Sequence, residues 1–220
     1  MLRLDSLNKR FLKNMPNGHY NYYICTVKRK IHREDILNAG LELMQLQGYS
    51  ATGIKDITDK IKIPKGSFYN HFNSKEEFGL EIIDFYMSRV AVHLIKMLND
   101  EKIKPLKRIK LALEADASYQ KNMNECKLGC MLGNFCQELG DVDEAFNKAV
   151  SNAFSEMKLG FKNCIQEAID NKDLSSDYNS GQLADYIING WQGALLRMKA
   201  EKNTKPLELF IKILFDKILV

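Results

Sequence analysis

A stretch in the first third of the chain carries two short apolar patterns separated by a proline. Three isoleucines stand at spacings that share one helical face: Ile54, Ile57 and Ile61. Pro64 ends that helix, because proline has no backbone N–H and disfavours helical angles in the residue before it. Phe68 and Phe72 repeat the four-residue spacing after the turn. The pattern predicts two short helices joined by a tight turn, with the Thr52 hydroxyl capping the first helix.

The second of these helices directs an unusual set of side chains outward. They are rich in hydrogen-bond donors and include an aromatic ring: Lys65, Ser67, Tyr69, Asn70 and His71. Gly66 lowers helix propensity by about 1 kcal/mol relative to alanine, which suggests a backbone that approaches another group closely, such as a phosphate. Two helices of this size with a short turn are typical of the helix-turn-helix, whose second helix enters the major groove of DNA.

The segment from Ile54 to Glu77 resembles the DNA-binding region of TetR/AcrR-family transcriptional regulators. The second motif helix of that family reads roughly Gly-Ser/Thr-Phe/Leu-Tyr-x-His/Tyr-Phe, and residues 66–72 match it in order, followed by Ser74-Lys75-Glu76-Glu77. The resemblance implies an all-α fold, in which a three-helix DNA-binding head is attached to a helical body that binds an effector and forms a homodimer.

The predicted contacts with double-stranded operator DNA divide into two kinds. Lys65, Ser67 and Asn70 are expected at base edges or phosphates, since lysine often pairs with guanine and asparagine with adenine. Phosphate contacts are expected from the preceding helix and from the flanks of the second. The full predicted DNA-binding set is Lys55, Lys65, Gly66, Ser67, Tyr69, Asn70, His71 and Lys75.

The rest of the chain is a series of apolar helical patterns separated by polar loops, without strand alternation or an internal repeat. We divide it into an N-terminal extension (1–30), a helix-turn-helix domain (31–75) and an effector-binding and dimerisation domain (76–220), with about nine helices in all. Ser74 and Glu77 read as a capping box for a helix that continues to about Leu98 and connects head to body as a lever. The other helices are expected at 31–47, 105–122, 129–140, 182–202 and 204–219, and at 141–170 behind an Asp141 or Asp143 cap.

Charge is distributed unevenly along the chain. The net charge is +4, but residues 1–75 have an excess of seven basic side chains and residues 76–220 an excess of three acidic ones. A basic first third suits a head that binds a polyanion, and chance clustering is the alternative. No apolar run reaches the ~18–20 residues of a membrane span, and the N-terminus lacks a signal-peptide pattern. We expect a cytoplasmic protein with free thiols, no cofactor and no membrane partner.

Residues 1–30 show no helical period and contain the basic run Lys28-Arg29-Lys30. Members of the family that the chain resembles usually begin close to the first helix, so this extension is a departure. We expect a flexible tail. A mobile arm that touches phosphate and an over-extended gene start, given Met15, are the alternatives.

Cys126, Cys130 and Cys136 fall close together, but zinc would want a fourth ligand and tighter spacing, so no metal site is predicted. The segment Gly129–Asn134 resembles the Gly-Cys-Leu-x-x-Asn segment of a subgroup that includes electrophile-responsive repressors. A thiol near a helix start would favour the thiolate, and its modification would add bulk beside a packed pocket. The alternative is a small buried residue that fills a gap.

The body contains many aromatic and methionine side chains, and the resemblance implies that some of them line an effector pocket. The residues predicted for it are Tyr119, Met123, Cys130, Met131, Phe135, Phe154 and Trp191. Each of them taken alone fits an ordinary core position better than a pocket position. The last two helices carry broad apolar surfaces, which predict either packing within the chain or the four-helix-bundle dimer that the resemblance implies.

We interpret the chain as a homodimeric DNA-binding transcriptional regulator, a repressor released from a palindromic operator by a small apolar or electrophilic effector. An enzyme using Cys130 is one alternative, but it would need a base beside the thiol, and only Glu138 is a candidate in the nearby sequence. A helical protein-interaction adaptor with a vestigial DNA-binding head is the other. It predicts that Tyr69→Ala and Lys65→Ala leave function intact.

Overall fold

The computed structural model describes residues 32–140 and 143–220, and every regular element in these ranges is helical. The predicted extension at 1–30, the expected helix start at Ile31 and the candidate cap Asp141 lie outside the described residues. The described chain forms one compact unit. Its α-helices are α1 (Arg33–Gln47), α2 (Ile54–Lys60), α3 (Lys65–Tyr69), α4 (Lys75–Tyr86), α5 (Val92–Leu98), α6 (Pro105–Asn124), α7 (Met131–Leu139), α8 (Glu144–Asp170), α9 (Ser180–Glu201) and α10 (Lys205–Ile213).

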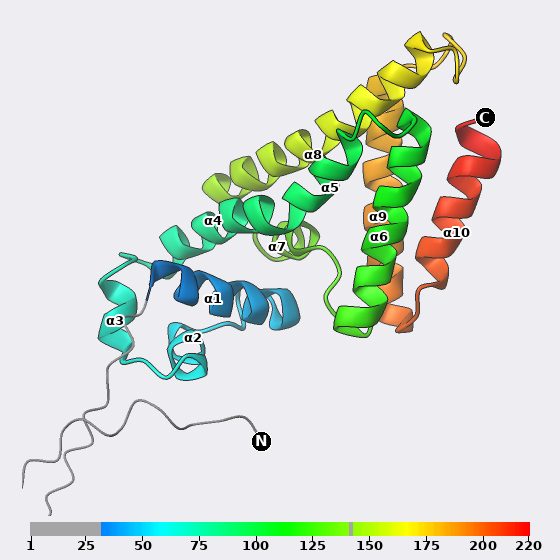
Figure 1. The fold of residues 1–220 in the computed structure, drawn as a ribbon. Helices are drawn as coiled ribbons and strands as arrows, with labels where there is room; N and C mark the ends of the chain where they lie inside the picture. Colours follow the sequence, from blue (N-terminus) through cyan, green and yellow to red (C-terminus); the bar gives the residue numbers. More distant parts are fainter. Residues whose placement is uncertain (1–31, 141–142) are drawn as a thin grey trace, which may run out of the picture. The chain divides into compact units, whose positions relative to one another are not determined.

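The helices α1, α2 and α3 form a small head beside the first turns of α4 (Figure 1). Phe68 and Phe72 are buried, as the four-residue spacing predicts, and their rings pack against Phe78 of α4 at centroid distances of 5.1 and 4.7 Å. Ile36 and Ile57 complete this core and are fully buried. Aromatic contacts of this kind hold a five-residue helix that is too short to be stable alone.

The capping of α2 differs from the prediction. The Thr52 hydroxyl donates to the carbonyl of Gly48 at 2.7 Å, so it closes the preceding turn instead of accepting from α2. Asp56 caps the helix, because its carboxylate accepts from the N–H of Gly53 at 2.7 Å. The sequence argument considered only a residue before the helix as its cap. Asp56 lies inside the first turn and caps the helix by reaching back to its start.

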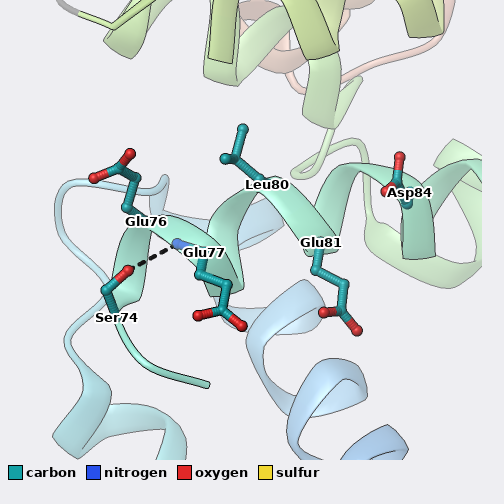
Figure 2. A pocket seen from close by; sticks show the side chains of 6 residues that line it. All are labelled: Ser74, Glu76, Glu77, Leu80, Glu81 and Asp84. Atoms are coloured by element: carbon teal, nitrogen blue, oxygen red, sulfur yellow. Dashed lines mark hydrogen bonds between the residues drawn. The ribbon is translucent and has the colours of Figure 1, made fainter. Parts of the chain in front are cut away.

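Half of the predicted capping box of α4 is present. The Ser74 hydroxyl accepts from the N–H of Glu77 at 3.0 Å, as Figure 2 shows. The Glu77 carboxylate does not return to Ser74; it accepts from the backbone and side-chain amides of Asn73 at 2.9 and 2.8 Å. The start of α4 is fixed all the same, since the backbone N–H groups of Glu77 and Asn73 both have an acceptor.

The long helix expected from Ser74 to about Leu98 is interrupted. Residues Met87–Ala91 form a π-helical turn between α4 and α5. A π-turn carries one extra residue, so it rotates the following side chains relative to a regular helix. The connector between head and body therefore has a local irregularity where the body begins.

The body is a layered helical bundle in which α8 packs against α6, α7 and α9, and α10 packs against α6 and α9 (Figure 1). Arg108 of α6 is buried, and its guanidinium donates to both carboxylate oxygens of Glu167 on α8 at 2.7 and 2.8 Å. Asp143 caps α8 by accepting from Ala145 and Phe146. No helix in the described ranges has the length and apolar character to cross a membrane.

Candidate DNA-binding surface and effector cavity

The exposed face of the head carries the predicted DNA-binding residues. Lys55, Lys65, Gly66, Tyr69 and Asn70 are exposed, whereas Ser67, His71 and Lys75 are half-buried. The Lys65 ammonium lies 5.9 Å from the centre of the Tyr69 ring, so the two point along the same face of α3. A Cβ atom placed on Gly66 would meet no atom within 4 Å. The backbone of α3 is thus open to an approaching molecule at this point.

Lys75 is less free than its neighbours. Its ammonium lies 4.3 Å from the centre of the Tyr49 ring and 3.4 Å from the carbonyl oxygen of Ser50. Burial lowers the pKa of Lys75, while the carboxylates of Glu138 and Asp56 act in the opposite direction. Lys75 therefore braces the loop between α1 and α2.

A hollow along the outer face of α4 is lined mainly by acidic side chains (Figure 2). It is lined by Ser74, Glu76, Glu77, Leu80, Glu81 and Asp84. The Glu81 carboxylate pairs with Arg33 of α1, so this surface is partly engaged in holding the head together. Its charge would repel phosphate, which leaves the face of α3 as the candidate for DNA.

The body encloses a mostly apolar cavity of about 370 Å³. Helices α4, α5, α6, α8 and α9 line it, together with Gln45 of α1 and the turn before α7. Leu94, Met97, Leu113, Met157, Phe161, Ile188 and Leu195 provide much of its apolar wall. The volume falls within the range of roughly 300–1,000 Å³ typical of small-molecule sites.

Three of the residues predicted for an effector pocket lie at this cavity, and three others do not. Tyr119, Cys130 and Trp191 line it. Met131, Phe135 and Phe154 are not among its lining residues. Met131 and Phe135 are fully buried core residues, and the Phe135 ring packs 5.7 Å from that of Tyr49 in the head. The side chain of Met123 lies outside the described residues.

The cavity also contains polar groups that sequence analysis did not select. They are Gln45, Tyr86, Arg89, His93, Asp116, Gln120 and Gln192. Trp191 donates its indole N–H to the Asp116 carboxylate at 2.8 Å, and the amide nitrogen of Gln120 lies 3.3 Å from the other carboxylate oxygen. Burial raises the pKa of Asp116, and these two hydrogen bonds oppose the shift. The sequence signal was available: Asp116 and Gln120 interrupt the apolar face of α6 at a spacing of four.

Cys130 is buried at the start of α7, with its sulfur 3.9 Å from the hydroxyl of Tyr86. The thiolate expected from its position before a helix is not favoured. Burial raises the pKa of the Cys130 thiol, and hydrogen bonds from Gly133, Gln192, Tyr86 and Leu132 only offset part of that effect. No histidine or carboxylate is among these partners, and Glu138 is occupied by the backbone amides of Tyr49 and Ser50.

Metal-binding side chains are not clustered in the described ranges: no group of three or more His, Cys, Asp or Glu residues there has the arrangement of a metal site. Cys126 and Cys164 are buried, whereas Cys136 is exposed. The Cys164 thiol donates to the carbonyl of Leu98 at 3.0 Å and so serves packing between α8 and α5.

An exposed second helix in a helix-turn-helix head and an internal cavity in a helical body are the features of a DNA-binding transcriptional regulator. The chain belongs to the TetR family. Residues 36–82 match the family described as "Bacterial regulatory proteins, tetR family". Residues 105–214 match the family described as "Tetracyclin repressor-like, C-terminal domain".

Individual relatives agree with this assignment. The repressor DhaR of Mycobacterium sp. (strain GP1) is 32% identical over 187 residues, which cover 85% of this chain and 92% of DhaR. The repressor NemR of Escherichia coli K12 is 25% identical over 80% of this chain and 88% of NemR. The crystal structure of a regulatory protein TetR from Rhodobacter sphaeroides superposes on this chain with a TM-score of 0.77 and 32% sequence identity. The match covers 81% of this chain and 94% of that one.

Proposed function

We propose that this regulator is a homodimeric repressor that binds a palindromic operator and is released when a small effector enters the body cavity. The observation that carries the proposal is the presence, in one compact unit, of an exposed donor-rich α3 and a separate, mostly apolar cavity. The names of DhaR and NemR as repressors support the direction of regulation. Because its target is genomic DNA, we place the protein in the cytoplasm.

The DNA contacts follow from the exposed face of the head. Lys65, Ser67 and Asn70 are proposed to reach base edges, since they lie on α3 or at its end. The other proposed contacts, made with phosphates, come from Lys55, Tyr69, His71 and Lys75 and from the backbone at Gly66. Phosphate contacts position the head on the duplex, whereas base contacts determine the sequence that it reads.

The dimer is proposed to form through α9 and α10. Leu196 of α9 is 54% exposed, and Leu209 and Ile213 of α10 are 54% and 41% exposed. The buried faces of both helices already pack within the chain, so these outward residues are available to a second copy. A two-fold axis there would present two α3 helices to two half-sites about one DNA turn apart.

Two connections link the cavity to the head. The first is α4, which carries Tyr86 at the cavity and Phe78 in the core of the head. The second is α7, which begins after Cys130 at the cavity and near its other end carries Glu138, the acceptor for the loop between α1 and α2. A ligand that shifts either helix reorients the head. A coupling free energy of about 1–3 kcal/mol would change operator affinity about 5–150-fold.

DNA binding is tested by fluorescence anisotropy with a duplex from the protein's own upstream region, and an unrelated duplex of equal length serves as the reference. We expect affinity for the upstream duplex to be higher and to fall with salt, because lysine contacts release counterions. Lys65→Ala and Tyr69→Ala should weaken binding by about tenfold. Lys162→Ala, which removes an exposed lysine from α8, is the matched control.

The absence of salt-dependent binding by the wild-type protein would refute the DNA-binding role proposed for α3. If Lys65→Ala and Tyr69→Ala bind DNA and regulate like the wild type, the adaptor with a vestigial head is the better interpretation.

An electrophilic effector is the second candidate, because Cys130 lines the cavity. The test is a gel shift with and without N-ethylmaleimide, comparing the wild type with Cys130→Ser. Release of DNA by the wild type alone assigns sensing to Cys130. Equal behaviour of the two proteins assigns Cys130 to packing and leaves reversible apolar ligands as the effectors.

A further inference from the structure

Among the described residues that line the cavity, Asp116 of α6 is the only one with a carboxylate. It stands on the face of α6 that turns toward the cavity, since Leu113 and Tyr119, three residues before and after it, also line the wall. Asp116 is half-buried, so part of its surface is accessible. Because it lines the cavity, a ligand inside can reach that surface. This inference rests on the proposed function, in which the cavity is the effector site.

The hydrogen-bond partners of the Asp116 carboxylate within the described chain are neutral. One oxygen accepts from the indole N–H of Trp191 at 2.8 Å, and the other lies 3.3 Å from the amide nitrogen of Gln120. An ionised carboxylate offers about four lone-pair positions. Two neutral donors therefore leave acceptor capacity unused and do not balance the negative charge.

The basic side chains of the wall do not supply that balance. Arg89 and His93 line the cavity and are exposed, as expected for side chains at its rim. Arg89 already pairs with Glu34 of α1. Burial raises the pKa of Asp116, and the effects that oppose this shift come from its two hydrogen bonds and not from a charged group. The carboxylate is thus a charge inside the body for which the described residues provide no cation.

The surroundings of Asp116 suit a cationic ligand. Tyr86, Tyr119 and Trp191 line the same cavity, and aromatic faces attract cations. Burial raises the pKa of the Tyr86 hydroxyl, and Cys130 and the charge of Asp116 raise it further, which indicates that Asp116 and Tyr86 are neighbours. An ammonium group would find a carboxylate and aromatic rings in one site, whereas Asp116 would repel a carboxylate or phosphate ligand.

We propose that the effector is a small, largely apolar molecule with one protonated amine, whose ammonium group binds the carboxylate of Asp116. Its apolar part lies against Met157, Phe161 and Leu195 of the cavity wall. The fold has already removed the carboxylate from bulk water, so the ligand supplies the missing countercharge. Hydrogen bonds between charged groups are stronger than those between neutral groups. The site therefore selects an amine over an alcohol of the same shape.

The test uses three probes built on one rigid hydrocarbon cage. They are 1-aminoadamantane, which is an ammonium ion at neutral pH, 1-adamantanol, which is a neutral donor, and adamantane-1-carboxylate, which is an anion. Trp191 is the single tryptophan of the chain and donates to Asp116, so its fluorescence reports binding at this site, and isothermal titration calorimetry gives an independent Kd. We expect the amine to bind at least about tenfold more tightly than the alcohol and the carboxylate not to bind.

Asp116→Asn keeps the shape of the side chain and removes its charge, so the ratio of the alcohol and amine Kd values should fall close to one. Binding of the alcohol by this variant shows that the cavity is intact. Glu114→Gln neutralises an exposed carboxylate of the same helix that does not line the cavity, and it should keep the wild-type ratio. The three probes on the wild type decide the proposal even if Asp116→Asn does not fold.

The proposal is overturned if the alcohol or the carboxylate binds the wild type as tightly as the amine, if no probe binds, or if a folded Asp116→Asn keeps the wild-type ratio. Operator binding measured on the same samples separates the two proposals. Salt-dependent DNA binding without preference for the amine rejects only the ligand class, whereas absence of DNA binding by the wild type rejects the proposed function. Preferential binding of the amine that leaves operator affinity unchanged retains the amine site at Asp116 and rejects release through this cavity.

Discussion

Glu138→Gln tests the connection between the body and the head. The Glu138 carboxylate accepts from the backbone amides of Tyr49 and Ser50 at 3.2 and 2.8 Å, far along the chain from α7. In Glu138→Gln, the amide oxygen still accepts from one of these backbone N–H groups. The NH₂ group then faces the other N–H group, which loses its acceptor. A hydrogen bond to a charged group contributes about 1.5–3 kcal/mol. Because Ser50 is exposed, we take the lower limit and expect a loss of about 1.5 kcal/mol in the free energy of unfolding.

The assay is urea unfolding at fixed protein concentration, so that any dimer equilibrium contributes equally. Glu156→Gln, which neutralises an exposed glutamate of α8, is the control. We also expect Glu138→Gln to weaken operator binding, because a freer loop between α1 and α2 must be ordered again on DNA. A stability loss below about 0.5 kcal/mol, the range of ordinary surface changes, together with unchanged operator affinity, would refute the role given to Glu138.

Further predictions concern other parts of the fold. Gly48→Ala should destabilise by about 1–3 kcal/mol in urea, because φ is +88° and the new Cβ would collide with the Glu138 carboxylate; an unchanged midpoint contradicts this. Arg108→Met should cost about 2 kcal/mol in the same urea assay, because it breaks the ion pair between the buried Arg108 and Glu167, whose side chain is 41% exposed; Arg108→Lys should be closer to wild type. Leu209→Glu should yield monomers in analytical ultracentrifugation if α10 lies in the interface. Since burial raises the pKa of Asp116, its contribution to stability falls as pH rises above 3.8, and Asp116→Asn should flatten that part of the pH–stability curve.

The sign of the Asp116 effect follows from proton binding. The unfolded carboxyl loses its proton first as pH rises, so the folded state binds more protons across the interval up to its raised pKa. Stability decreases with pH in such an interval. A curve for Asp116→Asn that matches the wild type would show that this carboxyl titrates normally.

Local patterns in the sequence predicted the head well. The spacing of Phe68 and Phe72 was enough to predict that both are buried, although α3 ends at Tyr69 and Phe72 lies beyond its end. The cap at α2 was predicted wrongly, because Thr52 and Asp56 are both capable of capping and the choice depends on where the preceding turn places the Gly48 carbonyl. Sequence spacing does not contain that information.

The cavity shows the same limit in the body. Trp191, Tyr119 and Cys130 line the cavity, whereas Phe135 and Met131 belong to the core. A sequence pattern does not separate the two groups, because all five residues are apolar or aromatic. Which side of an apolar helix faces a void depends on how neighbouring helices cross. The thiol of Cys130 is a further case, since its place before a helix was evident from the sequence, whereas the choice between a favoured thiolate and a buried packing residue was left open.

The sequence by itself determined that the chain is helical, that it carries a helix-turn-helix and that the second motif helix exposes hydrogen-bond donors, because helical period and turn chemistry are local properties. Only the tertiary structure decided which residues surround the cavity and that Glu138 ties α7 to the head. These features depend on contacts between residues distant in sequence, and such contacts arise only when the helices pack.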